Sequence, residues 1–207
     1  MSRLRKIKND SEKIITSKYY LLSSPKITKK SNHLEIGMGK GNFLISMAEN
    51  NKNINFYGID KFATVILKAI NKLKLLDKTL SNLYFLQLNA SDLLKIFPKN
   101  FFDVIYLNFN DPWPKKRHEK RRLISNFYLP IYKQLLSPKG IIKFKTDNEN
   151  YYKYSLELLR LNKDVVIEYY TDNFYKDKNP NNFVLTEYES KFINLNVPIK
   201  CIHFKYK

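Results

Sequence analysis

The sequence has a single cysteine, Cys201, which excludes an internal disulfide framework and any multi-cysteine zinc site. It contains no apolar run near the roughly 20 residues that a membrane span needs. Its N-terminus is charged throughout and shows no apolar segment of the kind found in secretory signals. These absences predict a cytoplasmic protein that uses no metal and does not enter a membrane.

Acidic residues are also scarce, because 37 Lys and Arg stand against 19 Asp and Glu, for a formal net charge of +18. Only six of the cationic residues are Arg, and an A/T-biased genome would also place lysines at tolerant surface positions. Clustering is the stronger signal, since Lys115–Arg122 holds three of those Arg against one acid. The charge therefore favours a polyanionic partner such as a nucleic acid.

A length of 207 residues is most simply one domain. Residues 1–30 are basic and weakly periodic, which predicts either a flexible arm that orders on a partner or a solvated tail. Residues 31–207 alternate strand and helix patterns, which predicts a mostly parallel α/β sheet with helices on both faces. The expected strands are 33–36, 54–59, 83–88, 101–107, 141–145, 165–170 and 200–204. The expected helices are 42–50, 62–76, a short one from 91, 121–136 and 149–161.

Glycine is rare as well, yet three of the five glycines, Gly37, Gly39 and Gly41, directly follow the first strand. Their Gly-x-Gly-x-Gly spacing differs from the dinucleotide fingerprint Gly-x-Gly-x-x-Gly. Glu35, just before them, would repel a pyrophosphate but suits a ligand with a positive charge, such as an amino group or a sulfonium. The alternative is a tight strand–helix turn that binds nothing.

Polar side chains end the next two strands. Asp60 stands where an acid typically binds ribose hydroxyls, although it could equally cap the following helix. Asn89 could recognise an adenine edge, and Asp92 is either a helix cap or a ligand contact. Ligands of parallel sheets lie beyond the carboxyl ends of the strands, so we expect Glu35, Asp60 and the acid after the fourth strand to share one cleft. An adenosyl group with a cationic tail, S-adenosylmethionine rather than NAD, fits this set.

The fourth strand runs into Asn-Phe-Asn-Asp-Pro-Trp-Pro at residues 108–114. Its two prolines stop the strand and stiffen the turn that holds Asp111. Trp113, the only tryptophan, either stacks on a base or packs beneath the loop. Because the cationic run follows at once, this turn predicts an enzyme acting on a nucleic acid.

Four segments occur in the order seen in bacterial tRNA (guanine-N7-)-methyltransferases, which the chain resembles from about residue 30 to its end. They are Leu-Glu-Ile-Gly-Met-Gly-Lys-Gly at 34–41, Asp-Pro-Trp-Pro-Lys-Lys-Arg-His at 111–118, Phe-Lys-Thr-Asp-Asn at 144–148 and Thr-Glu-Tyr-Glu-x-Lys-Phe at 186–192. The resemblance implies a Rossmann-like class I S-adenosylmethionine-dependent methyltransferase with a seven-stranded, mostly parallel sheet. It also implies methylation of guanine N7 in the tRNA variable loop, expected at guanine 46.

The resemblance further implies residue roles. Asp111 is expected to be the active-site acid, and Asn89 departs from the family pattern, because many relatives have an acid there. The expected cofactor positions are Glu35, Gly37, Gly39, Asp60, Asn89 and Asp111. The expected substrate positions are Lys115, Asp147, Thr186, Glu187, Tyr188 and Glu189, with a helix cap as the alternative for Asp147. Phosphate contacts, or a solvated helix face, are expected from Lys116, Arg117, Arg121 and Arg122.

Guanine N7 has a lone pair and no proton, so it can attack a sulfonium methyl in line without a general base. We expect Asp111 and Glu189 to orient the guanine by accepting hydrogen bonds from its N1–H and N2. The alternatives are an adenine-N methyltransferase, which usually has Asn/Asp-Pro-Pro-aromatic at this turn, and an inactive RNA-binding subunit. A nicotinamide dehydrogenase is disfavoured by the glycine spacing. A monomer is expected, with a dimer as the alternative.

Overall fold

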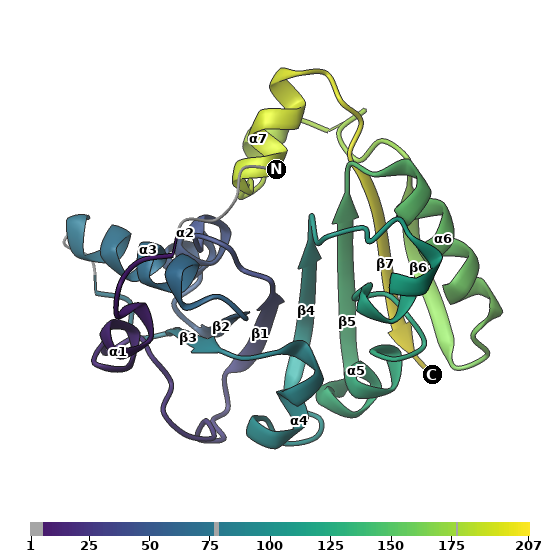
Figure 1. Ribbon diagram of the computed structural model, residues 1–207. Coiled ribbons are helices and arrows are strands. Elements are labelled where there is room, and N and C mark those ends of the chain that lie inside the picture. The colour runs from purple at the N-terminus through teal and green to yellow at the C-terminus, as the bar shows by residue number, and fades with distance from the viewer. Residues whose placement is uncertain (1–5, 77–78, 177) are drawn as a thin grey trace.

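The computed structural model describes residues 6–76, 79–176 and 178–207. Within them, seven strands form one sheet in the order β3-β2-β1-β4-β5-β7-β6 (Figure 1). The strands are β1 (Ser31–Ile36), β2 (Ile54–Asp60), β3 (Leu83–Gln87), β4 (Phe102–Asn108), β5 (Leu136–Thr146), β6 (Val165–Thr171) and β7 (Lys200–Tyr206). Among these strands, only β7 runs opposite to the other six, which confirms the mostly parallel sheet.

Helices cover both faces of this sheet. The α-helices are α1 (Asp10–Ile15), α2 (Asn42–Asn50), α3 (Ala63–Leu75), α4 (Leu93–Ile96), α5 (Leu129–Leu135), α6 (Glu149–Leu161) and α7 (Glu187–Asn194). Three short 3-10 turns, η1 (Ala90–Asp92), η2 (Lys116–Arg121) and η3 (Pro180–Asn182), complete the described elements. Apolar side chains of α1, α2 and α3 form one core with the sheet, and those of α4, α5 and α6 form a second core.

The strand order reverses between β1 and β4, which continue to opposite edges of the sheet. In open α/β sheets the ligand crevice lies at this point, outside the carboxyl ends of the strands. In Figure 1, β1, β4 and β5 run towards α7, which stands over their ends. The fold thus presents the residues that follow β1 and β4 to a common space.

Two predicted elements are wrong in their extent. The helix expected over 121–136 is only α5, because η2 ends at Arg121 and residues 122–128 form no helix. Pro130 lies in the first turn of α5, where its missing N–H is tolerated. Gly140, expected after the helix as part of its stop, lies inside β5, where an added Cβ would come within 2.9 Å of the Phe102 carbonyl oxygen.

The described part of the basic segment 1–30 packs against the domain, and the division expected at residue 31 stays a prediction. Ile14 of α1 is fully buried against the α3 side of the core. Further on, the Leu21 amide donates to the Phe85 carbonyl at 3.0 Å, and the Phe85 amide donates to the Tyr19 carbonyl at 2.7 Å. Residues 19–21 therefore extend the sheet beside β3, and residues 1–5 lie outside the described range.

No helix among the described residues is long and apolar enough to cross a membrane. The same residues contain no group of three or more His, Cys, Asp or Glu side chains that could hold a metal ion.

Candidate active site

A cavity of about 660 Å³ opens at the carboxyl ends of β1, β2, β3 and β4. Its lining includes Glu35, Asp60, Asn89 and Asp111. The predicted convergence of these strand ends in one cleft is therefore confirmed. The volume lies within the range of small-molecule and cofactor sites.

Glu35 is the buried acid of this cavity, with only 3% of its surface exposed. Its Oε1 accepts a hydrogen bond from the Asn108 side chain at 2.9 Å, and its Oε2 has no partner within the described chain. Burial raises the pKa of Glu35 to about 8. The hydrogen bond from Asn108 lowers this pKa, and the nearby charges of Glu189 and Asp60 raise it slightly. A ligand cation would give Oε2 a partner and favour the carboxylate, so the site fits a group with a positive charge.

The glycine loop brings backbone close to the ligand space. At Gly39 (φ +54°) an added Cβ would meet nothing within 4 Å, so the loop is open towards the cavity it lines. At Gly37 (φ +79°) the Cβ would lie 2.8 Å from the Asn110 side-chain nitrogen, which itself donates to the Ile36 carbonyl. Only glycine permits both the left-handed backbone and this approach of the β1 and β4 loops.

Asp60 braces the glycine loop from the end of β2. Its Oδ2 accepts from the Gly39 amide at 3.3 Å and its Oδ1 from the Phe62 amide at 3.0 Å. Burial raises the pKa of Asp60. The N-cap of α3 is Phe62, without a side-chain cap bond, so Asp60 forms a turn before the helix and is not its cap.

Asn89 also faces the cavity. Its side chain is exposed and makes no hydrogen bond within the described chain, which leaves an amide donor and acceptor for a ligand. Asp92 instead pairs with Lys95 at 2.6 Å and does not line the cavity.

Asp111 lies exposed on the opposite loop and has no hydrogen bond or ion pair to any described residue. Phe109 (φ 50°) and Trp113 (φ 43°) on either side of it adopt the left-handed region, which is rare for bulky residues. Strained backbone of this kind concentrates at functional sites. The turn thus holds a free carboxylate at the cavity.

Arg122 fixes that turn. Its Nε donates to the carbonyls of Pro112 at 3.1 Å and Trp113 at 3.3 Å, and its Nη2 donates to Trp113 at 3.2 Å. Its guanidinium also lies 4.1 Å from the centroid of the Tyr154 ring. Arg122 therefore shapes the turn, and its expected phosphate contact stays a prediction.

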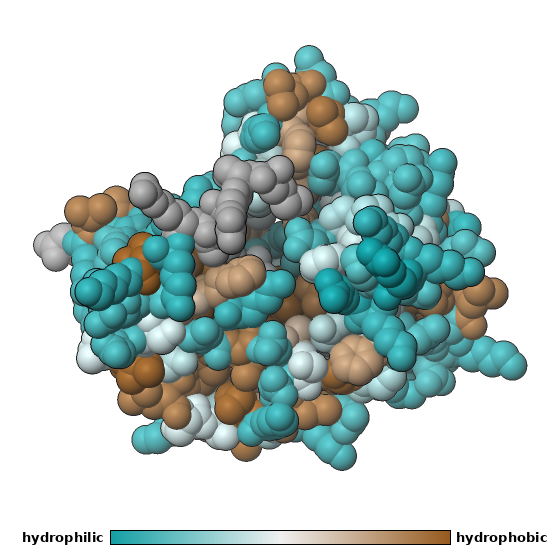
Figure 2. Space-filling model, viewed as in Figure 1, coloured by the Kyte–Doolittle hydropathy of each residue, from teal (hydrophilic) through white to brown (hydrophobic). Residues whose placement is uncertain are grey.

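The other members of the cationic cluster are exposed at the rim. Lys115, Lys116 and Arg117 lie outside the cavity lining, and none has an ion pair within the described chain. Arg121 lines the cavity and lies 5.0 Å from the Trp113 ring centroid. Figure 2 shows hydrophilic side chains gathered over the right-hand side of the face in view.

The segment 186–189 forms the first turn of α7 and lies only partly in the cavity. Thr186 lines it and caps the helix, and Glu187 pairs with Lys40 at 3.1 Å across the cavity rim. Tyr188, 55% exposed, stacks on Phe109 with 5.8 Å between ring centroids.

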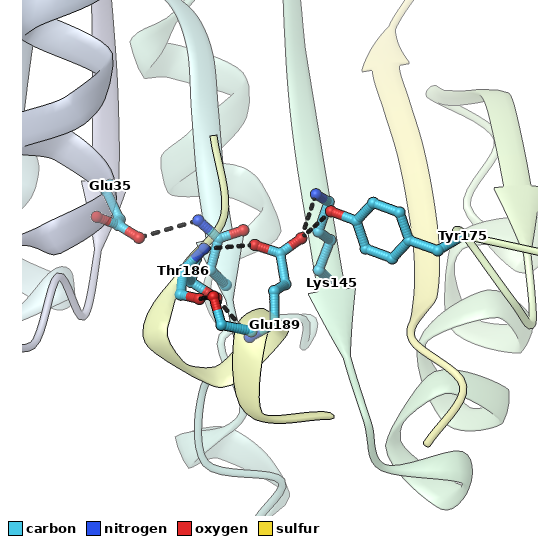
Figure 3. Close-up of polar contacts among 7 residues, drawn as sticks. Glu35, Lys145, Tyr175, Thr186 and Glu189 are labelled. Carbon is cyan, nitrogen blue, oxygen red and sulfur yellow. Dashed lines mark hydrogen bonds and ion pairs between the residues drawn. The ribbon is translucent and has the colours of Figure 1, made fainter. Parts of the chain in front are cut away.

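Glu189 and Asp147 do not line the cavity. Glu189 has no exposed surface, and both of its oxygens accept hydrogen bonds from the protein (Figure 3). This geometry contradicts the expected contact between Glu189 and guanine. The cap of α6 is Asn148, which accepts from the Tyr151 amide at 2.8 Å, so Asp147 is not the cap either.

Sequence reasoning missed three residues around the site, Asn108, Lys145 and Tyr175. Asn108 ends β4 beside the predicted acid, and that position was the available signal. Lys145 lies in the segment 144–148 that resembles the family, but neither its contact with Glu189 nor that of Tyr175 is indicated by a sequence pattern.

Comparison with known proteins gives consistent matches. Residues 29–202 match a family model described as "Putative methyltransferase". The chain is 42% identical to a tRNA (guanine-N(7)-)-methyltransferase of Mycoplasmoides gallisepticum, with 99% of each chain covered. It is 44% identical to one from a Geobacillus species, over 77% of this chain and 71% of that one.

Solved structures are similar in fold. A SAM-dependent methyltransferase from Aquifex aeolicus superposes with a TM-score of 0.58 at 14% identity, over 86% of this chain and 84% of that one. An rRNA methylase from Streptococcus thermophilus gives 0.56 at 12% identity, over 87% and 89%. The expected Rossmann-like class I methyltransferase fold is confirmed.

Proposed function

Because the chain belongs to the tRNA (guanine-N(7)-)-methyltransferase family, we propose that it transfers a methyl group from S-adenosylmethionine to N7 of a guanine in tRNA. We further propose that the acceptor is guanine 46 of the variable loop and that N7 attacks the methyl group in line. The observation that carries the proposal is that two acids line one cavity. Glu35 is buried with one carboxylate oxygen lacking a hydrogen bond, and Asp111 is exposed and has no partner in the described chain.

On the donor side, S-adenosylmethionine supplies an activated methyl group on a sulfonium. Glu35 binds the cationic end of this cofactor through Oε2, which has no other partner in the described chain. Asp60 accepts from the ribose hydroxyls with the lone pairs left by its two backbone bonds, and Asn89 bonds the adenine edge. Gly39 lets the loop backbone approach without a side chain between.

On the acceptor side, Asp111 orients the guanine and stabilises the positive charge that develops on the purine as N7 is methylated. Tyr188, stacked on Phe109, offers an exposed ring for the base. No base is required, and His33 and His203 lie outside the cavity lining. Burial lowers the pKa of each to about 4, so both are neutral at pH 7.

For the remainder of the tRNA, the exposed cations Lys115, Lys116, Arg117 and Arg121 contact backbone phosphates. Contacts of this kind position an RNA and weaken with salt but do not read its sequence. Specificity for guanine therefore comes from the cavity.

The proposal is tested by incubating the full chain with tritiated S-adenosylmethionine and unmodified tRNA, then cleaving the product at 7-methylguanosine. Label at a single guanine in the variable loop is the expected result. Label on adenine would support an exocyclic-nitrogen methyltransferase instead. Cofactor binding without label in tRNA would support an RNA-binding subunit that has lost catalysis.

A further inference from the structure

The carboxylate of Glu189 is held by donors from three separate segments of the chain (Figure 3). Its Oε1 accepts from Lys145 Nζ of β5 at 2.6 Å and from the Tyr175 hydroxyl at 2.7 Å. Its Oε2 accepts from the Thr186 amide at 2.8 Å, which closes the capping box of α7. With no exposed surface, the carboxylate has its bonds made by protein groups alone.

This arrangement exceeds what a helix cap needs. A capping box requires only that the glutamate accept from the N-cap amide, whereas Glu189 also accepts from Lys145 and Tyr175. Here the partner Lys145 is itself only 13% exposed, and its ammonium lies 4.4 Å from the Phe174 ring centroid. Removing two charges from water is costly, so such a pair is weak as a stabiliser but strongly fixes geometry when its hydrogen bonds are complete.

The ion pair of Lys145 and Glu189 fixes the position of the first turn of α7 relative to the cavity. Thr186 and Tyr188, on either side of the capped turn, both line the cavity, whereas Lys145, Tyr175 and Glu189 do not. Lys145, Tyr175 and Glu189 therefore act on the ligand space only through the first turn of α7.

The same anchor is tied to the donor side of the site. Lys145 pairs in register with Asn108 in the sheet, and Asn108 donates to Glu35 at 2.9 Å. Strand β4 thus carries Asn108, the hydrogen-bond donor to Glu35 of β1, and the neighbouring strand β5 carries Lys145, which anchors α7. The distance between Glu35 and the first turn of α7 is therefore set across three adjacent strands, β1, β4 and β5.

We propose that Lys145 and Tyr175 are positioning residues for methyl transfer. Through Glu189 they hold the first turn of α7 at the distance from Glu35 at which the base on Tyr188 faces the methyl donor. The inference rests on the proposed function and adds to it two residues that touch neither ligand.

The test compares Lys145→Met, Lys145→Arg and Tyr175→Phe with the wild-type chain. Lys145→Met leaves the buried Glu189 carboxylate without its cation, so α7 moves and single-turnover methyl transfer falls on the order of 100-fold. Dissociation of S-adenosylmethionine, followed by the fluorescence of the sole tryptophan, Trp113, stays within about threefold, because the donor residues are untouched. Lys145→Arg keeps the charge and recovers part of the rate.

Tyr175→Phe removes one of two donors to Oε1 and keeps the ring, so it folds even if Lys145→Met does not; its rate falls by about tenfold. Lys143→Met is the matched control, since Lys143 lies on the same face of β5 and makes no contact with Glu189. Turnover at the wild-type rate in Tyr175→Phe and Lys145→Met overturns the inference. Equal losses in turnover and cofactor affinity would also overturn it, because they indicate a purely structural role.

The wild-type chain separates the two proposals. If it makes no 7-methylguanosine, the proposed function fails. If it is active and the two variants match it, only the positioning role fails.

Discussion

The carboxyl of Glu35 keeps its proton in the folded chain up to about pH 8, because burial raises its pKa from 4.5. The unfolded chain loses this proton near pH 4.5, so the free energy of unfolding falls as pH rises from 4.5 to 8. Glu35→Gln removes this penalty and should be more stable than the wild type at pH 8, by at most about 5 kcal/mol, and equal near pH 4. Urea unfolding of the two ligand-free proteins at pH 4, 6 and 8 measures this difference in the free energy of unfolding. Identical pH trends in both would refute it.

Asp111 is exposed and unpaired within the described chain, so it contributes little to folding. Asp111→Asn should keep the free energy of unfolding within about 0.5 kcal/mol of wild type. Its methyl transfer should fall at least about 100-fold, because the amide lacks the charge that stabilises the methylated purine. Label incorporation into tRNA and urea unfolding provide the two readings. Asp172→Asn, a change of another exposed acid, serves as the control, and an active Asp111→Asn would exclude the acid as essential.

Among elements, the turn at 109–114 depends on Arg122 for its shape, because Arg122 donates three hydrogen bonds to its carbonyls. The nearby Arg117 makes no hydrogen bond to this turn in the described chain. Arg122→Gln should lose about 1–3 kcal/mol of stability together with turnover, because three hydrogen bonds to carbonyls disappear. Arg117→Gln should leave stability unchanged and reduce the salt dependence of tRNA binding by roughly one phosphate contact. Binding titrations from low to high salt distinguish the two. A weaker salt dependence of tRNA binding in Arg122→Gln would show that Arg122 also contacts a phosphate.

Elements with a clear apolar period and proper ends were predictable. Helices α2 and α6 begin and end where the sequence pattern places them. The start of α5 was not, because η2 shares the polar, cationic composition of a solvated helix face. Helix α7 was missed because it is short, and its stability comes from the capping box of Thr186 and Glu189 and from Lys145, a residue of another element.

At the scale of the whole molecule, the N-terminal segment adds to the core. Ile14 is fully buried there, whereas its neighbour Ile15 is 48% exposed. Ile14→Ala should therefore lower the free energy of unfolding by about 2–4 kcal/mol, and Ile15→Ala by less than about 0.5 kcal/mol. Urea unfolding compares the pair. Equal small effects would mean that α1 stands apart from the domain in solution.

The sequence by itself determined the sheet, the glycine loop and the strand-end acids. These depend on local period, on backbone freedom at Gly37 and Gly39, and on the rule that parallel strands end at one edge. Only the tertiary structure decided which polar groups face the cavity. Glu189 has the composition of a ligand contact, yet its Oε1 is bound by Lys145, a residue distant in the chain, and Arg122 is bound by carbonyls of the preceding turn. A side chain's hydrogen-bond partners depend on where the chain returns in space, which residue type alone does not specify.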